Sequence, residues 1–429
     1  MAGFEDVAEV VADPALMLVY EEGWNSWSPA GLYPATATSP RAPDALRQIM
    51  GYRPGKPGPE RGFQGEGLLG VVPPVGPARL WATTGPDIAS IRARAERDRL
   101  VVSADGPVVE TSSARLVDAL AAWADAAGPG RVRSIPPGWC SWYHYWQGVT
   151  EDDILVNLAA IGRLGLDVEI VQIDDGHQAA PGDWLERSPR FGPLDRLAGR
   201  IRAAGRVPGI WVAPFVVGEH SRLAAEHPDW LVEGADAGFN WEQRLGVLDV
   251  GHRAAAEHLE GVFRTLAEQG FVYFKLDFLY AGAIPGLDAY REGMRLIRAG
   301  AGPEAILLGA GPLLPSIGLV DAMRIGPDID PRFESATGDL SLPSGRGARA
   351  VSRARAWMHG RLWANDPDCL IVRPEVEHRE AWAEHVEACG GLVVSSDLLD
   401  ELDPRGLELT RRALRASTTD PVAWNPFEG

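Results

Sequence analysis

The 429-residue sequence lacks most features that mark secreted, membrane-bound or nucleic-acid-binding chains. Its three cysteines, Cys140, Cys369 and Cys389, are far apart and show no CxxC spacing, so we expect free thiols rather than a disulfide framework or a zinc site. No run of about 18 apolar residues occurs, so no membrane span is expected. The amino-terminal stretch "MAGFEDVAEVVAD" lacks the basic and apolar segments of a secretory signal, and the cytoplasm is the expected location.

Basic residues are also scarce, with 41 against 59 acidic ones and a formal charge of −18. This excess of negative charge argues against nucleic acid or an anionic membrane surface as a partner. Tryptophan, in contrast, is abundant at 15 residues. Its flat apolar face and single N–H donor suit stacking against sugar rings, although we expect most of these side chains to pack in the core.

Two stretches rich in tryptophan nearly repeat each other, "GWNSW" at 23–27 and "GWCSW" at 138–142. The sequences around them share nothing else. We therefore interpret them as two separate segments that meet the same chemical need, and not as a duplicated domain.

Residues 1–112 predict a reduced β domain. Short apolar runs at 16–20, 67–72 and 79–84 are separated by glycine and proline, and 29–62 is typical of a long loop. Asp105-Gly106 lies between two strand-like runs and predicts a β-hairpin. Apolar positions at helical spacing over 114–127 predict a helix, and the Pro/Gly-rich stretch after it completes a linker at 113–135.

From residue 136 to 416, strand-like and helical patterns alternate. This pattern predicts the α/β class, with a (β/α)8 TIM barrel behind a small N-terminal β-sandwich-like domain and a tail at 417–429. A doubly wound open sheet would need a Gly-rich phosphate loop after its first strand, where this chain has "CSWYHYW". The predicted strands are 138–143, 168–174, 209–215, 272–278, 305–310, 321–326, 362–366 and 392–397.

Aspartates stand at or just past the ends of five predicted strands: Asp174, Asp175, Asp277, Asp328, Asp366, Asp368 and Asp397. Chemistry in such a barrel takes place at the C-terminal strand ends, so we expect an acidic pocket there. No histidines repeat at HxH or HxxxH spacing, so no metal is predicted, although counts alone leave a Mg²⁺ site open. Glycoside hydrolysis fits better, because it requires two carboxyl groups beside the sugar.

Two carboxylates stand out as a candidate catalytic pair. Lys275 and Asp277 lie two apart on one strand, so both point to one side, and Lys275 would keep Asp277 ionised as a nucleophile. Arg324 and Asp328 flank a Gly-Pro turn that would bring Asp328 back across the strand end. A proton donor there needs a raised pKa, from burial or from the charge of Asp277. The Asp174–Asp175 pair could accept two neighbouring hydroxyls. The structural alternatives are an ordinary ion pair for Lys275 and Asp277, a helix N-cap for Asp328, and a turn with one helix-capping acid for the Asp174–Asp175 pair.

At these residues the chain resembles glycoside hydrolase family 36, the melibiase or α-galactosidase family. The resemblance covers roughly residues 136–400, and "GWNSWSPAG" is similar to a motif of that family's N-terminal domain. The matching stretches, in the family's order, are "PPGWCSWYHYW", "VEIVQIDDGHQ", "GIWVAPFVVGEHS", "EHPDWLV", "VYFKLDFLYAG", "PSIGLVDAMRIGPDID" and "LWANDPDCLIVRP".

The resemblance implies a retaining hydrolase of terminal α-galactosides that acts on a small carbohydrate without metal or cofactor. It implies Asp277 as the nucleophile and Asp328 as the general acid/base, with the two carboxyls about 5 Å apart. It also places the loop with "GWNSW" over the barrel mouth, so we expect Trp24 to close the sugar pocket from outside the barrel, the alternative being packing between the two domains. The remaining implied substrate contacts are Asp174 and Asp175 near O4 and O6, Trp211 as an aromatic wall, Lys275 and Arg324 near O2 and O3, and Trp142 or Tyr143 in the floor.

The chain also departs from the family. Ala310 stands where the family commonly has a cysteine facing O2 of the sugar, which leaves room at C2 and opens the way to an α-N-acetylgalactosaminide. The β domain is short and little room remains for a C-terminal β domain. Such domains often help in subunit contacts, so the family's oligomeric state is not carried over and a homo-oligomer stays an open alternative. A galactosyl transferase and a catalytically silent sugar-binding barrel are the remaining alternatives.

Overall fold

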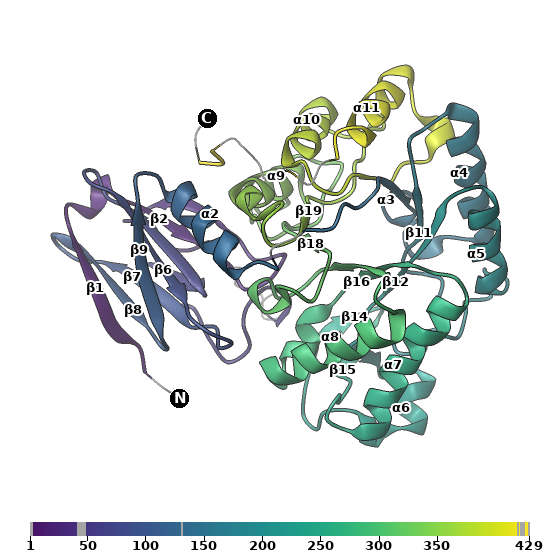
Figure 1. Cartoon of the computed structure of the whole chain (residues 1–429), viewed down its shortest axis with the longest axis horizontal. Coiled ribbons are helices and arrows are strands. Elements are labelled where there is room, and N and C mark those ends of the chain that lie inside the picture. Colours follow the sequence, from purple (N-terminus) through teal and green to yellow (C-terminus); the bar gives the residue numbers. More distant parts are fainter. Residues whose placement is uncertain (1–2, 41–48, 130–131, 418–419, 421–424, 428–429) are drawn as a thin grey trace.

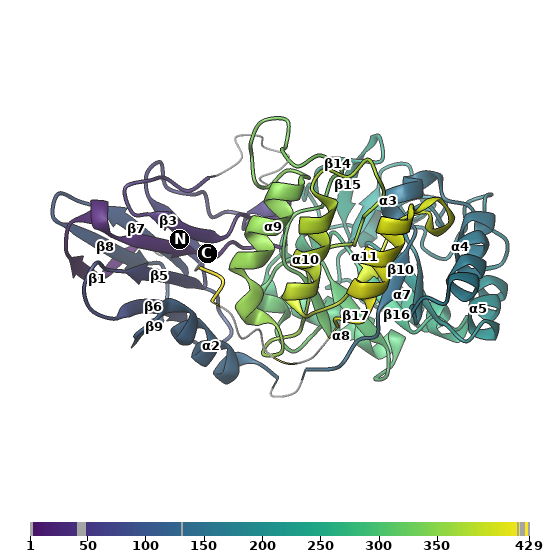
Figure 2. The same cartoon turned by 90° about the horizontal axis from the view of Figure 1, so that it is seen from above.

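The computed structural model describes residues 3–40, 49–129, 132–417, 420 and 425–427. It has two lobes side by side, an N-terminal β domain and a larger α/β barrel (Figures 1 and 2). Helix α2 (Leu116–Ala127) packs between them and leads from the first lobe into the second.

The β domain consists of two antiparallel sheets. One has the order β1-β8-β7-β4 and the other β3-β2-β5-β6-β9. Successive side chains of a strand point to opposite faces, so Val19 and Trp81 fill the space between the sheets, while Tyr20 and Leu80 pack toward α2 and the barrel. The strands are β1 (Glu5–Val11), β2 (Leu18–Glu21), β3 (Gly31–Pro34), β4 (Phe63–Glu66), β5 (Leu68–Val72), β6 (Ala78–Thr83), β7 (Ser90–Ala95), β8 (Arg99–Ala104) and β9 (Val108–Ser113).

Two local predictions in this domain are wrong. Asp105-Gly106 does not close a hairpin, because β8 pairs with β1 and β7 while β9 pairs with β6 in the other sheet. The chain bends at these residues and crosses from sheet to sheet, because β8 is buried between β1 and β7 while β9 adds to the edge of the other sheet beside β6. The segment 29–62 is not one loop, since β3 pairs with β2 inside it; its residues 41–48 lie outside the described part.

The predicted barrel is confirmed. Eight parallel strands follow the order β19-β18-β17-β16-β12-β11-β10-β20, and a parallel bridge from Leu370 to Ser395 joins the two ends of that order. All eight strands lie within or overlap the predicted ranges. They are β10 (Gly138–Cys140), β11 (Ile170–Ile173), β12 (Val207–Val212), β16 (Tyr273–Leu276), β17 (Ile306–Gly309), β18 (Ala322–Arg324), β19 (Ala364–Asp366) and β20 (Val394–Ser395).

Helices cover the outside of the barrel, and several of them begin at a side-chain cap. In α4, for example, Thr150 and Asp153 form a capping box, and Gly165 ends the helix at a φ of 61°. Between β17 and β18 the described chain has only a 3-10 turn, Leu314–Ser316. The barrel helices are α3 (Trp142–Tyr145), α4 (Glu151–Leu164), α5 (Leu194–Ala203), α6 (Arg222–Glu226), α7 (Arg253–Glu268), α8 (Leu287–Ala301), α9 (Gly345–Ala354), α10 (Arg379–Cys389) and α11 (Pro404–Leu414).

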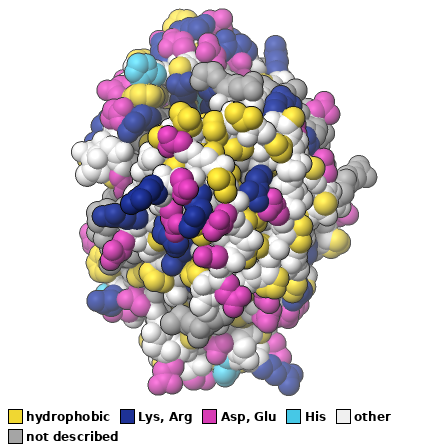
Figure 3. Space-filling view, turned by 90° about the vertical axis from the view of Figure 1, so that its left-hand side faces the viewer, with side chains coloured by type: hydrophobic (Ala, Val, Ile, Leu, Met, Phe, Trp, Pro, Cys, Tyr) yellow, Lys and Arg dark blue, Asp and Glu magenta, His cyan; other side chains and the backbone are white. Residues whose placement is uncertain are grey.

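The outer end of the β domain carries charges of both signs with apolar side chains between them (Figure 3). None of the helices in the described part of the chain is both long and apolar enough to cross a bilayer. Cys140, Cys369 and Cys389 are free and buried. Within the described ranges, no group of three or more histidine, cysteine or acidic side chains is arranged to hold a metal ion.

Candidate active site

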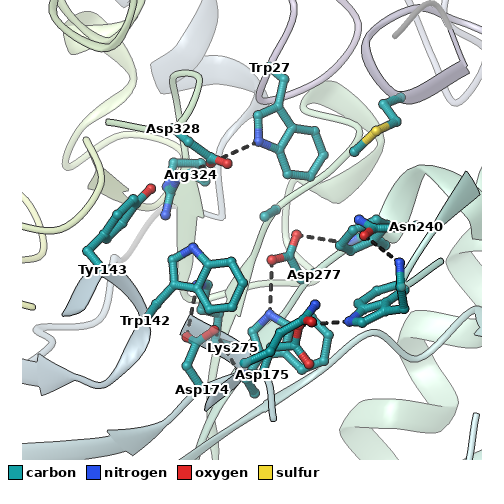
Figure 4. A pocket seen from close by; sticks show the side chains of 16 residues that line it. Trp27, Trp142, Tyr143, Asp174, Asp175, Asn240, Lys275, Asp277, Arg324 and Asp328 are labelled. Atoms are coloured by element: carbon teal, nitrogen blue, oxygen red, sulfur yellow. Dashed lines mark hydrogen bonds and ion pairs between the residues drawn. The ribbon is translucent and has the colours of Figure 1, made fainter. Parts of the chain in front are cut away.

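A pocket of about 700 Å³ lies at the C-terminal ends of the barrel strands (Figure 4). The predicted site residues line it, with the exception of Trp24. Six strands of the barrel, an inserted hairpin and the N-terminal domain all contribute. The lining residues are Trp27, Met50, Trp142, Tyr143, Gln147, Asp174, Asp175, Trp211, Asn240, Trp241, Lys275, Asp277, Phe278, Ala310, Arg324 and Asp328.

Asp277 comes directly after β16 and points into the pocket. The Trp211 indole N–H donates to its Oδ2 at 3.0 Å, and the Phe278 amide donates to its Oδ1 at 2.8 Å. Burial raises the pKa of Asp277, while the Lys275 charge and the Trp211 hydrogen bond act against that rise. Phe278 has a φ of 51°, a left-handed conformation that bulky residues rarely adopt and that recurs at functional sites.

Lys275 pairs with Asp174 rather than with Asp277, which is two residues further along the chain. Its Nζ donates to Asp174 Oδ2 at 3.0 Å, and both side chains are buried. Burial alone would lower the pKa of Lys275, but the negative charges of Asp174 and Asp277 outweigh it and the pKa is raised. Lys275 therefore stands as a cation between two carboxylates, and its effect on Asp277 is through space.

Asp175 lines the same pocket and receives three side-chain donors. Trp241 and Gln147 donate to its Oδ2 at 2.8 and 3.1 Å, and Gln178 donates to its Oδ1 at 2.6 Å. Burial raises the pKa of Asp175, and the Gln178 and Trp241 hydrogen bonds oppose this rise. The two consecutive acids thus have different partners: Asp174 accepts from the Lys275 cation as well as from Gln172 and Cys140, whereas the three side-chain donors of Asp175 are neutral.

Asp328 follows β18 and is the more open of the two candidate catalytic acids, with 40% of its side chain exposed. Its Oδ1 accepts from Arg324 Nη1 at 3.0 Å and from the Trp27 indole N–H at 3.2 Å (Figure 4). Both donors use the same oxygen. The arrangement therefore leaves Oδ2 of Asp328 available for proton transfer.

Arg324 is buried and also pairs with two acids, one at the end of β19 and one two residues past it. Its Nε lies 3.1 Å from Asp366 Oδ2, and its Nη2 lies 2.5 Å from Asp368 Oδ1. Tyr143 donates its hydroxyl hydrogen to the other oxygen of Asp368. Burial raises the pKa of Asp368 to about 7 against the opposing Arg324 charge. This network fixes the guanidinium that holds Asp328.

The prediction that Trp24 closes the pocket is wrong. Trp24 is 2% exposed and packs in the core between the lobes, with the Arg53 guanidinium 5.2 Å from its ring centroid and its indole nitrogen without a hydrogen-bond partner. Trp27, three residues further on, reaches the pocket instead. The "GWNSW" stretch does contribute to the site, but spacing alone does not show which indole faces outward.

Sequence reasoning missed Met50, Gln147, Asn240, Trp241 and Phe278 as lining residues. Asn240 and Trp241 belong to a hairpin of β14 (Phe239–Asn240) and β15 (Gln243–Val247), inserted between β12 and β16 beside β13 (Val216–Gly218). Trp241 and Glu242 occupy its turn with φ values of 49° and 58°. Such turns favour Asn-Gly, so the sequence carries no hairpin signal there.

A parallel barrel with two carboxylates at its strand ends, set among indoles and charged side chains, offers the groups that glycoside hydrolysis requires. A family model described as Melibiase matches residues 141–281. An α-galactosidase from Thermus thermophilus, TtGalA, is 30% identical and has a TM-score of 0.82, with 96% of this chain and 91% of that chain covered. Its structures hold p-nitrophenyl α-D-galactopyranoside and stachyose. The chain therefore belongs to glycoside hydrolase family 36.

More distant proteins share the fold or part of the sequence. The GH36 α-galactosidase AgaA from Geobacillus stearothermophilus shares the fold at 13% identity and a TM-score of 0.62, covering 95% of this chain and 62% of that one. The α-galactosidase Mel36A from Lactobacillus acidophilus is 22% identical over 247 residues, which is 56% of this chain and 31% of the relative. The chain matches less than a third of the length of Mel36A and of two other curated α-galactosidases.

Proposed function

We propose that this protein hydrolyses terminal α-linked galactosides with retention of configuration, with Asp277 as nucleophile and Asp328 as general acid/base. The observation that carries the proposal is the difference between the two carboxylates in one pocket. Asp277 is buried and fixed at both oxygens, whereas Asp328 is partly exposed and fixed at one. A nucleophile needs a fixed position beside the sugar, and an acid/base must reach both leaving group and water.

In the first step an Asp277 oxygen attacks C1 of the sugar, and Asp328 gives its proton to the glycosidic oxygen. The C1–O bond breaks and a galactosyl ester of Asp277 forms. In the second step Asp328, now a carboxylate, takes a proton from water as the water oxygen attacks C1. The ester bond breaks, galactose leaves and both carboxyls return to their starting forms.

The other pocket residues support recognition of a polar sugar. Asp174, Asp175 and Lys275 offer acceptors and a donor on one side, and Trp142 and Trp211 offer aromatic faces. Neutral partners at Asp175 could be exchanged for sugar hydroxyls without leaving a buried charge unpaired.

A second candidate substrate is an α-N-acetylgalactosaminide, favoured by one observation. Ala310, directly after β17, lines the pocket with only a methyl group. A small side chain there leaves space for a larger substituent on the sugar. Transfer of galactose to an acceptor other than water would use the same two carboxyls.

The first prediction is that Asp277→Ala and Asp328→Ala lose activity in different ways. Asp277→Ala should lower kcat on 4-nitrophenyl α-galactoside by at least about 10⁴-fold, because no covalent step remains. Asp328→Ala should retain far more activity on this substrate than on alkyl galactosides, since nitrophenolate needs no protonation.

Product stereochemistry provides the decisive readout. With azide, Asp277→Ala should release the β-galactosyl azide and Asp328→Ala the α-galactosyl azide, both identified by NMR. Equal turnover by wild type and both variants would show that the residue assignment is wrong. The same assay on 4-nitrophenyl α-N-acetylgalactosaminide compares the two sugars directly.

A further inference from the structure

A second space opens beside the catalytic pocket, on the side of Asp328. It measures about 620 Å³ and shares three lining residues with the catalytic pocket, namely Trp27, Met50 and Asp328. Its other walls are Gly51 and Tyr52 from the N-terminal domain and Ser341, Leu342 and Pro343 from the loop that follows β18. Because Asp328 belongs to both spaces, a group that leaves from C1 on the acid's side would enter this one.

The two spaces differ sharply in chemistry. The catalytic pocket has four carboxylates, a lysine and an arginine in its lining. The second space has Asp328 as the one charged member of its lining, and its other side chains are an indole, a thioether, a phenol ring, a leucine, a proline and a serine. Contact between such walls and a bound group would come mainly from apolar burial.

Several polar groups of these walls are already engaged within the protein. Ser341 donates both its amide and its hydroxyl hydrogen to Asp339 Oδ1, each at 2.8 Å. The carbonyl of Met50 accepts from Asn25 Nδ2 at 2.5 Å, and the carbonyl of Gly51 accepts from the Ser28 hydroxyl. A sugar in this space would therefore give up water contacts at its hydroxyls without full replacement, which is unfavourable.

Resting on the proposed function, we infer that this space is an aglycone site and that it selects α-galactosides whose leaving group is apolar, such as an aryl or arylalkyl alcohol. The site is built jointly by the two lobes. The wall at 50–51 is held by Asn25 and Ser28 of the "GWNSW" region, and Leu342 lines the space from the barrel. Glycone and aglycone are thus recognised by different chemistry on the two sides of Asp328.

The test compares substrates with alcohol leaving groups, 2-phenylethyl, methyl and 6-O-glucosyl α-galactoside. Wild type should show a kcat/KM for the phenylethyl substrate about tenfold or more above the methyl one, because the ring is buried in the second space. Leu342→Asn should cut this ratio by about tenfold. It should leave α-galactosyl fluoride hydrolysis unchanged, because fluoride has no group to bind there.

A matched control lies two residues away. Leu340 is half-buried like Leu342 but lines a separate groove with Leu18 and Phe427, so Leu340→Asn should leave the ratio unchanged. If Leu342→Asn keeps the wild-type ratio while fluoride is hydrolysed, the aglycone site is refuted. A higher kcat/KM for the glucosyl than for the phenylethyl substrate, lowered by Leu342→Asn, would refute its apolar selectivity. Failure to hydrolyse the fluoride would instead refute the proposed function.

Discussion

Asp328 receives donors from two distant parts of the chain on a single oxygen. Arg324 comes from the same strand end, while Trp27 comes from the N-terminal domain. Hydrogen bonds to a charged group contribute about 1.5–3 kcal/mol, more than neutral ones. The indole thus orients the proposed acid/base from outside the barrel and also borders both the glycone and the aglycone spaces.

The residue-scale prediction separates the two tryptophans of "GWNSW". Trp27→Phe keeps a ring but removes the N–H that Asp328 accepts, so kcat/KM on an alkyl α-galactoside should fall about tenfold. The fall on 4-nitrophenyl α-galactoside should be smaller, because its leaving group needs little protonation. Trp24→Phe is the matched control, since its indole nitrogen has no hydrogen-bond partner. Equal losses in both variants would contradict the role given to Trp27.

At the scale of elements, Arg355, which directly follows α9, holds the loop that carries Trp27 by hydrogen bonds. Its guanidinium is fully buried and donates to Glu22 Oε1 at 2.7 Å, to the Ser26 carbonyl at 2.9 Å and to the Ile325 carbonyl at 3.1 Å. Ile325 directly follows β18. The "GWNSW" loop also bonds to the end of β17, where Ser26 and Gly311 exchange hydrogen bonds of 3.0 Å. The N-terminal loop is thereby joined to two barrel strands.

The element-scale prediction concerns this buried ion pair. Arg355→Met should lower the free energy of unfolding by about 3–5 kcal/mol, because Glu22 is left as an uncompensated buried charge. The double variant Glu22→Gln/Arg355→Met should regain about 1–3 kcal/mol of that loss. Urea denaturation of wild type, both single variants and the double variant measures these differences. A double variant no more stable than Arg355→Met would show that the loss comes from packing alone.

At the scale of the whole molecule, two histidines are buried in neutral form. Burial lowers the pKa of His177 to about 4 and that of His385 to about 3. His177 Nε2 lies 2.8 Å from the Trp211 carbonyl, beneath the pocket, while His385 on α10 lies 2.7 Å from the Ser352 hydroxyl of α9. The unfolded chain binds protons near pH 6.5 and the folded protein does not, so each histidine costs stability as the pH falls below that value.

The molecule-scale prediction concerns how the free energy of unfolding changes with pH. Between pH 7 and pH 5 each histidine should remove about 2 kcal/mol from the free energy of unfolding. His385→Gln, which retains a partner for Ser352, should reduce the loss over this interval by about 2 kcal/mol relative to wild type. Asp368, with a pKa of about 7, acts in the opposite direction, but it is present in both proteins and cancels in the comparison. Identical pH dependence in the two proteins would contradict the burial of a neutral His385.

The sequence by itself determined the barrel and most of its polar lining. Strand runs followed by aspartate recur through 136–416, and a parallel barrel necessarily brings its strand ends together, so Asp174, Asp277 and Asp328 could be placed in one pocket by pattern alone. Alternation along single strands similarly predicted that Lys275 and Asp277 share a side.

Only the tertiary structure decided which partners these residues take. Lys275 pairs with Asp174, which follows a strand two positions away in the barrel. The indole that reaches Asp328 is that of Trp27, because the packing of the two lobes buries Trp24. The crossing of the chain at Asp105-Gly106 was likewise decided by pairing between distant strands, β8 with β1 and β9 with β6. Short-range patterns set the direction of a side chain within its element. Contacts between distant elements depend on which faces are buried together, because folding minimises the exposed apolar surface of the whole chain.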